Sequence, residues 1–169
     1  MSRSPEVGSQ APDFTVPGLV LSGDGEARRG DYTLSGPGHR GTPLVLVFYP
    51  GDDTPVCTKQ LCAYTSELDR FKAVNATVWG ISPQGLDSHE RFARRHSLGF
   101  PLLADTDRAV ARAYGVAVPG LGLRRSVFIL DADGIVRWKH VAVLGLTFQA
   151  VDTLTEHLAT VTTGGQARD

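Results

Sequence analysis

Residues 44–62 read LVLVFYPGDDTPVCTKQLC, and this stretch decides the class of fold. The run from Leu44 to Tyr49 is continuously apolar, which is typical of a strand buried on both faces. After the turn at Pro50, Thr54 can cap a helix and Pro55 suits the first helical position. A buried strand that leads directly into a helix predicts an α/β architecture.

The helix that begins near Pro55 is predicted to run to Val74. Its apolar side chains recur at spacings of three and four, which is typical of a helix face packed on a core. These residues are Leu61, Tyr64, Leu68, Phe71 and Val74. Cys57 lies four residues before Leu61 and therefore on the same stripe, whereas Cys62 is turned about 100° away from it.

Further strands and helices alternate along the chain. We expect extended segments at residues 11–16, 77–82, 101–105, 126–130 and 135–140, and helices at 86–96, 109–114 and 147–158. The tight turn Asp131-Ala132-Asp133-Gly134 joins the last two strands, and residues 22–42 are read as a glycine-rich loop with a hairpin arm near Tyr32. This order predicts a thioredoxin-like α/β fold, with a central mixed sheet flanked by helices.

Length and composition indicate one domain. The chain has 169 residues, of which 41% are apolar and 21% charged, and this is enough to bury a sizeable core. We expect a single domain over residues 11–161. The flanking residues 1–10 and 162–169 are rich in small, polar and charged side chains, so we expect them to be flexible tails.

The charge and hydropathy patterns exclude several classes of partner. A net charge of -1 gives no general attraction to nucleic acid or anionic membranes. The longest apolar run, Pro43 to Pro50, is too short to span a bilayer, and the first residues lack the apolar core of a signal peptide. With two cysteines, we expect a cytoplasmic protein with reduced thiols. We also expect a monomer, because no extension is available to reach a partner's site.

The histidines do not indicate a metal centre. Their separations do not match metal-ligand spacing, so we assign all of them to the surface and expect no bound metal. They are His39, His89, His96, His140 and His157.

Cys57 lies where a helix N-terminus can activate its sulfur. The free N–H groups and partial positive charge of that end favour a thiolate over a thiol. A thiolate that reduces a peroxide also needs groups that hold the peroxide oxygens and stabilise the departing hydroxide. The N–H groups of Val56 and Cys57, the hydroxyl of Thr54 and a nearby guanidinium could supply them. Pro50 could cover the pocket and limit the access of water.

These residues match a known motif. Pro50, Thr54 and Cys57 have the spacing Pro-x-x-x-Thr-x-x-Cys, which is the active-site motif of the peroxiredoxins. With Cys62 five residues after Cys57, the stretch resembles the bacterioferritin-comigratory, or peroxiredoxin Q, subfamily. The resemblance covers roughly residues 9–158.

Two further positions extend the resemblance. Ala11-Pro12-Asp13-Phe14 is similar to the opening motif of the family, and Arg125 matches its active-site arginine on a late strand. Arg124 adjoins Arg125, so the arginine could also be Arg124. The chain departs from the subfamily at Val56, where a glycine often precedes the cysteine, and this affects the flexibility and shape of the pocket.

The resemblance implies a thioredoxin-dependent peroxiredoxin of the atypical two-cysteine type. Cys57 would be the peroxidatic cysteine, which attacks hydrogen peroxide or an alkyl hydroperoxide and becomes a sulfenic acid. Cys62 would be the resolving cysteine, which forms an intramolecular disulfide with Cys57. A thioredoxin-like donor would then reduce the disulfide, and no cofactor is needed.

Two other classes of function fit the same fold. A protein thiol–disulfide exchanger would be favoured by Cys-x-x-Cys, whereas this chain has four residues between its cysteines. A copper-binding module would need Cys-x-x-x-Cys on one helix face, and a spacing of five does not place both sulfurs on one face.

Overall fold

The computed structural model describes residues 4–36, 41–52, 54–118, 122–142 and 149–166. The strands are β1 (Thr15–Leu21), β2 (Ala27–Thr33), β3 (Leu44–Phe48), β4 (Thr77–Ser82), β5 (Leu102–Ala104), β6 (Ala117–Val118), β7 (Gly122–Leu123), β8 (Ser126–Leu130) and β9 (Val136–Val141). The helices are α1 (Pro55–Ser66), α2 (Leu68–Ala73), α3 (Leu86–His96), α4 (Ala109–Ala113) and α5 (Val151–Gln166).

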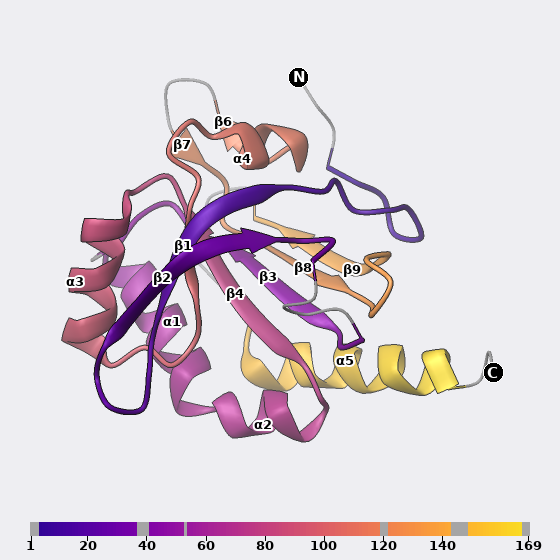
Figure 1. Cartoon of the computed structure of the whole chain (residues 1–169). Coiled ribbons are helices and arrows are strands. Elements are labelled where there is room, and N and C mark those ends of the chain that lie inside the picture. Colours follow the sequence, from indigo (N-terminus) through magenta and orange to yellow (C-terminus); the bar gives the residue numbers. More distant parts are fainter. Residues whose placement is uncertain (1–3, 37–40, 53, 119–121, 143–148, 167–169) are drawn as a thin grey trace.

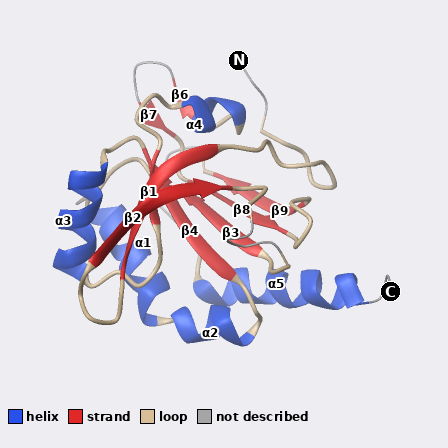
Figure 2. Cartoon of the chain, in the orientation of Figure 1, coloured by secondary structure: helices blue, strands red, loops and turns tan. Residues whose placement is uncertain are grey.

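Seven of these strands form one mixed sheet in the order β2-β1-β5-β4-β3-β8-β9 (Figure 1). β3 pairs in parallel with β4 and antiparallel with β8, while β6 and β7 pair separately. Helices cover both faces of the sheet (Figure 2). The predicted α/β class, with a central mixed sheet flanked by helices, is therefore confirmed.

The fully buried strand β3 divides the core into two layers. Val45 and Val47 belong to the apolar cluster that also contains residues of α1, α2, α3 and α5. Leu46 and Phe48 belong to the opposite cluster, which contains residues of α4. Because side chains alternate along a strand, a strand with both faces covered reads as a continuous apolar run.

The register of β3 determines what lies near the start of α1. Phe48, at the end of β3, is opposite Ile81 of β4 on one side and Ser126 of β8 on the other. The loop that follows β3, the end of β4 and the beginning of β8 therefore meet at one edge of the sheet. This arrangement brings Arg125, one residue before β8, towards the start of α1.

The first strand differs from the prediction. The sequence indicated a strand at residues 11–16, but β1 covers Thr15–Leu21 and pairs along its length with β2, inside the predicted glycine-rich loop. Pro17 and Gly18 follow the predicted segment, and both lie within β1. A Cβ at Gly18 would come within 2.7 Å of the Tyr32 ring, so glycine permits this close pairing.

The long predicted helix is divided in two. Glu67, with φ of -108° and ψ of 20°, separates α1 from α2. The break leaves the apolar stripe almost in place, because Leu61, Tyr64 and Phe71 all remain buried. A break that preserves the apolar spacing cannot be detected from periodicity alone.

Both ends of the chain also differ from the prediction. The Gly8 N–H donates to the Val136 carbonyl at 2.7 Å, and the Val136 N–H donates to Ser9 at 2.9 Å, so this part of the predicted tail is attached to β9. At the other end, α5 begins at Val151 and continues to Gln166, past the predicted boundary at residue 161. The predicted helix positions 147–148 lie outside the described residues.

Candidate active site

Cys57 lies in the first turn of α1, and its sulfur is in contact with a cation. The Arg125 guanidinium donates from Nη2 to Cys57 Sγ at 2.8 Å. Cys57 is fully buried and Arg125 is only 3% exposed, so this contact is shielded from water. A cation beside the sulfur and a helix N-terminus both favour a thiolate.

Backbone pairing on both sides holds Arg125 in place. Its carbonyl accepts a hydrogen bond from the Ala142 N–H at 2.9 Å, beyond the end of β9. The backbone N–H of the neighbouring Arg124 donates to the Val116 carbonyl at 2.7 Å, and Arg124 is exposed to solvent. The structure therefore places Arg125, and not Arg124, against the sulfur.

A second residue of α1 orients the same guanidinium. Arg125 Nη1 donates to Gln60 Oε1, and Gln60 Nε2 donates to the Tyr64 hydroxyl at 3.2 Å. The Tyr64 hydroxyl in turn donates to the Gln149 carbonyl at 2.7 Å, just before α5. Burial raises the pKa of Tyr64 to about 12, so this hydroxyl remains a donor at neutral pH. Gln60 was missed from the sequence, although its position three residues after Cys57 puts it on the same helix face.

Thr54 and Pro50 flank the beginning of α1. Thr54 is the residue before the helix, and its backbone carbonyl accepts the Thr58 N–H at 2.8 Å. Its side chain does not cap the helix as predicted, because the hydroxyl donates to the Gly51 carbonyl at 3.0 Å. Thr54 is exposed and Pro50 is half-buried, so the hydroxyl can be reached from solvent.

Cys62 has different surroundings from Cys57. It is half-buried and packs against the apolar cluster that includes Cys57, and both thiols are free. Burial raises the pKa of the Cys62 thiol above its ordinary value. Five residues along a helix correspond to a rise of about 7.5 Å and a rotation of about 500°, which points the two side chains about 140° apart.

One histidine contradicts the surface assignment. His89 is fully buried, and its Nδ1 lies 2.7 Å from Oδ2 of Asp52, in the loop before α1. This burial was not predicted, because a histidine in a polar helix is usually exposed. His96, His140 and His157 are only partly exposed, and His39 lies outside the described residues.

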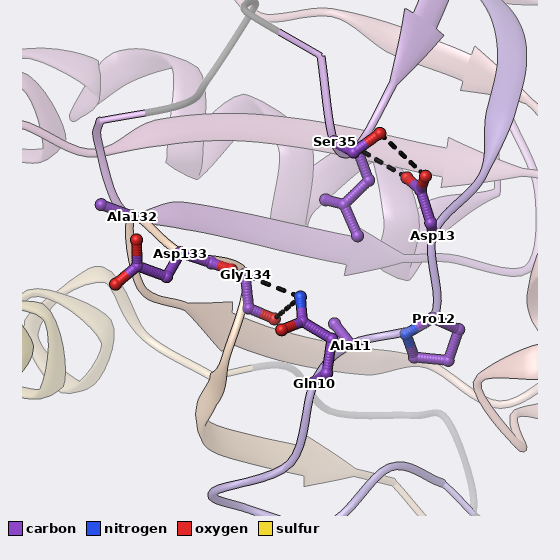
Figure 3. A pocket seen from close by; sticks show the side chains of 9 residues that line it. Gln10, Ala11, Pro12, Asp13, Ser35, Ala132, Asp133 and Gly134 are labelled. Atoms are coloured by element: carbon purple, nitrogen blue, oxygen red, sulfur yellow. Dashed lines mark hydrogen bonds between the residues drawn. The ribbon is translucent and has the colours of Figure 1, made fainter.

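A cavity of about 450 Å³ lies at the other end of the sheet (Figure 3). Gln10, Asp13, Ser35 and the turn at Ala132–Gly134 line it. The turn joins the end of β8 to β9, whereas Arg125 precedes the start of β8, so the cavity is remote from Cys57.

Within the residues that the structure describes, no group of three or more histidine, cysteine, aspartate or glutamate side chains could hold a metal ion. In the same residues, every helix is too short or too polar to cross a membrane.

Comparisons with known proteins point to one protein family. The AhpC/TSA family matches residues 7–139. The chain is 34% identical to a putative peroxiredoxin Bcp of Coxiella burnetii, over 88% of this chain and 98% of that protein. It is 33% identical to peroxiredoxin Bcp of Bacillus subtilis, over 88% and 94% of the two chains.

Two further matches show the extent of the likeness. Chloroplastic peroxiredoxin Q of Oryza sativa subsp. japonica is 37% identical over 78% of this chain, which spans 57% of that protein. The solved structure of Mycobacterium tuberculosis AhpC superposes with a TM-score of 0.83 over 95% of both chains, at 23% identity. This structural likeness confirms the thioredoxin-like fold.

Proposed function

The chain belongs to the AhpC/TSA family, among the Bcp and peroxiredoxin Q proteins, and we propose that Cys57 is the attacking thiol of its thiol-dependent peroxidase activity. The contact between Arg125 Nη2 and Cys57 Sγ carries this proposal. A buried guanidinium stabilises a thiolate, and it can also donate to a peroxide oxygen that approaches the sulfur.

The first step is the transfer of one oxygen to sulfur. The Cys57 thiolate attacks the oxygen of ROOH that carries the hydrogen, and the O–O bond breaks. The departing RO⁻ takes from solvent the proton that the thiol released on ionisation, and it leaves as ROH. The product at Cys57 is a sulfenic acid. Here R is hydrogen or an alkyl group. Arg125, the free N–H groups of the first turn of α1 and the Thr54 hydroxyl are the donors for the charge that develops on oxygen.

Thr54 and Pro50 shape the approach to Cys57. The Thr54 hydroxyl donates to the Gly51 carbonyl, and it can exchange this bond for one to a peroxide oxygen. Pro50 has no N–H group and is half-buried, so it covers the pocket without adding a donor. Val56 adds an apolar side chain in the first turn of α1.

The second step is the formation of a disulfide with Cys62. The Cys62 thiol attacks the sulfenic sulfur, water leaves, and a Cys57–Cys62 disulfide forms. A regular α1 keeps the two side chains apart, since a disulfide needs Cα atoms within about 7 Å and converging side chains. Resolution therefore requires α1 to unwind between the two cysteines.

A thioredoxin-like dithiol completes the cycle. It reduces the disulfide to two thiols and is itself oxidised to a disulfide, so no metal or organic cofactor takes part. We assign this activity to a single domain of residues 11–161, extended by the attached Gly8 and Ser9 and by the end of α5, which works as a monomer in the cytoplasm.

A peroxide-consumption assay with free-thiol counting and intact mass tests this proposal. One equivalent of hydrogen peroxide should remove two free thiols and lower the mass by two hydrogens. An insulin-reduction assay on the same sample separates a peroxidase from a protein disulfide exchanger. Rapid insulin reduction together with slow peroxide consumption would contradict the proposal.

A further inference from the structure

A second buried polar cluster lies beside the thiol site, in the loop before α1. The side chains of Asp52 and His89 are 2% and 0% exposed. The Asp52 carboxylate accepts from the Tyr49 hydroxyl at Oδ1 and from the Ser88 hydroxyl at Oδ2, both at 2.7 Å. Oδ2 also lies 2.7 Å from His89 Nδ1. Asp52 precedes Cys57 by only five residues, yet its partners Ser88 and His89 belong to α3.

The partners of His89 define where its protons are. Nε2 lies 2.9 Å from the Leu103 carbonyl oxygen, which can only accept, so Nε2 carries a proton. Between Nδ1 and Asp52 Oδ2 there must be one further proton, because two lone pairs would repel each other at 2.7 Å. The Asp52–His89 pair is therefore neutral as a whole, which is compatible with its burial.

The two hydroxyl groups that contact the Asp52 carboxylate, those of Tyr49 and Ser88, are donors as well. Burial raises the pKa of Tyr49 well above its ordinary value, and the nearby Asp52 carboxylate raises it further. The Tyr49 hydroxyl therefore remains protonated and donates to Asp52. The backbone N–H of Asp52 donates to Gln84 Oε1 at 3.1 Å, in the segment between β4 and α3. Both the side chain and the backbone of Asp52 are thus attached to neighbouring elements.

These bonds hold the segment that carries the hydrogen-bond donors for the peroxide. Thr54 lies two residues after Asp52 and is followed by the first turn of α1, and the Thr54 hydroxyl donates to the Gly51 carbonyl. His89 links this loop to the Leu103 carbonyl of β5, so the loop is connected through α3 to the sheet. A shift of about 1 Å in a positioning group can lower a rate by about a hundredfold.

We propose that the Asp52–His89 pair is a positioning device for peroxide reduction, which holds the loop before α1 so that Thr54 and the first N–H groups of α1 face the substrate. The pair acts through Thr54 and α1, and its role is confined to the first step. The inference rests on the proposed function of Cys57.

Two substitutions of His89 form a matched test. The amide nitrogen of asparagine can occupy the place of Nδ1, so His89→Asn keeps the bond to Asp52 and loses the bond to Leu103. The amide of glutamine can occupy the place of Nε2, so His89→Gln keeps the Leu103 bond and loses the Asp52 bond. His89→Gln also loses the longer contact of 3.4 Å between Nδ1 and the Tyr49 hydroxyl. Each variant otherwise loses one short hydrogen bond of the ring, so a purely structural role predicts similar effects from both.

The measurement is the rate of Cys57 oxidation by hydrogen peroxide, followed by the rate of disulfide formation in the same sample. We expect His89→Gln to slow oxidation by about tenfold and His89→Asn to stay within about threefold of the unmodified protein. Disulfide formation should be unchanged in both. Equal slowing of oxidation by the two variants, or no slowing by His89→Gln, would overturn the inference.

Two controls keep the result interpretable. If His89→Gln does not fold, Ser88→Ala removes one donor from Asp52, and an oxidation rate equal to that of the unmodified protein would count against the positioning role. Cys57→Ser is measured in the same assay. If Cys57→Ser still consumes peroxide, the proposed function has failed. If Cys57→Ser is inactive and the two His89 variants slow oxidation equally, only the inference about the Asp52–His89 pair is contradicted.

Discussion

The two cysteines lie on the same helix, five residues apart, in opposite chemical environments. Cys57 is fully buried against the Arg125 guanidinium, whereas Cys62 is half-buried among apolar side chains, and burial raises the pKa of its thiol. One sulfur lies against a cation, whereas burial disfavours the charged form of the other. The difference comes from the residues that tertiary folding brings to each sulfur, since both share one helix and one backbone conformation.

The largest expected effect follows from removing the sulfur at Cys57. Cys57→Ser should abolish peroxide consumption, because a serine hydroxyl is far less nucleophilic than a thiolate at neutral pH. Cys62→Ser is the matched control, and its Cys57 should still react once with peroxide and stop at the sulfenic acid. The measurement is peroxide consumed per protein chain. Residual turnover in Cys57→Ser above a few per cent would mean that the attacking group lies elsewhere.

The next effect concerns the cation that distinguishes the two sites. Arg125→Ala should slow the reaction of Cys57 with hydrogen peroxide by more than about tenfold, since both the thiolate and the peroxide oxygen lose a fixed donor. Arg124→Ala is the matched control on an exposed neighbour and should leave the rate nearly unchanged. Stopped-flow measurement of the rate constant compares them. A larger effect from Arg124→Ala would mean that Arg124, and not Arg125, assists the reaction of Cys57.

A third prediction concerns the helix that separates the cysteines. Oxidation to the Cys57–Cys62 disulfide should lower the protection of amide hydrogens from exchange across α1, because the disulfide cannot form on a regular helix. Helix α2, at Leu68–Ala73, serves as the internal control and should keep its protection. Equal protection of α1 in the reduced and oxidised proteins, with the disulfide verified by mass, is the result that the unwinding model does not allow.

The smallest effect is the titration of Cys62. Burial disfavours the charged thiolate, so the midpoint for alkylation of Cys62 should lie above the ordinary thiol value of about 8.5. The Cys57→Ser variant isolates this thiol, and iodoacetamide labelling at a series of pH values gives the midpoint. Unfolding in denaturant should return the midpoint to the ordinary value. A midpoint at or below the ordinary thiol value in the folded protein would mean that burial does not disfavour the Cys62 thiolate.

The accuracy of the sequence-based elements depended on how much apolar pattern they carried. The strand at Leu44–Phe48 and the helix at Leu86–His96 were predicted closely, because one is continuously apolar and the other has clear helical spacing. Strand β2 was predicted only in part, as a hairpin arm near Tyr32, because its residues are mostly polar and exposed at the edge of the sheet. The break at Glu67 was missed because it hardly changes the apolar spacing.

Most of the candidate site was predicted from residues close together in the chain, and Arg125 was predicted from the family resemblance, with Arg124 left as the alternative. Cys57, Thr54 and Pro50 follow from a motif within eight residues, and the start of the helix from Pro55. Gln60 and His89 were missed, since an amide and a histidine in a helix carry no signal until their partners are known. His89 contacts Asp52, which lies 37 positions away in the chain, because α3 lies against the loop before α1.

The sequence by itself determined the α/β class and the position of a cysteine at a helix N-terminus, because apolar periodicity and helix-start residues act over a few neighbouring positions. Only the tertiary structure decided that Arg125 and not Arg124 contacts the sulfur, that Gln60 holds the guanidinium, and that His89 is buried on Asp52. These contacts depend on strand register and helix packing, which join residues far apart in the chain and are set by the burial of the whole core.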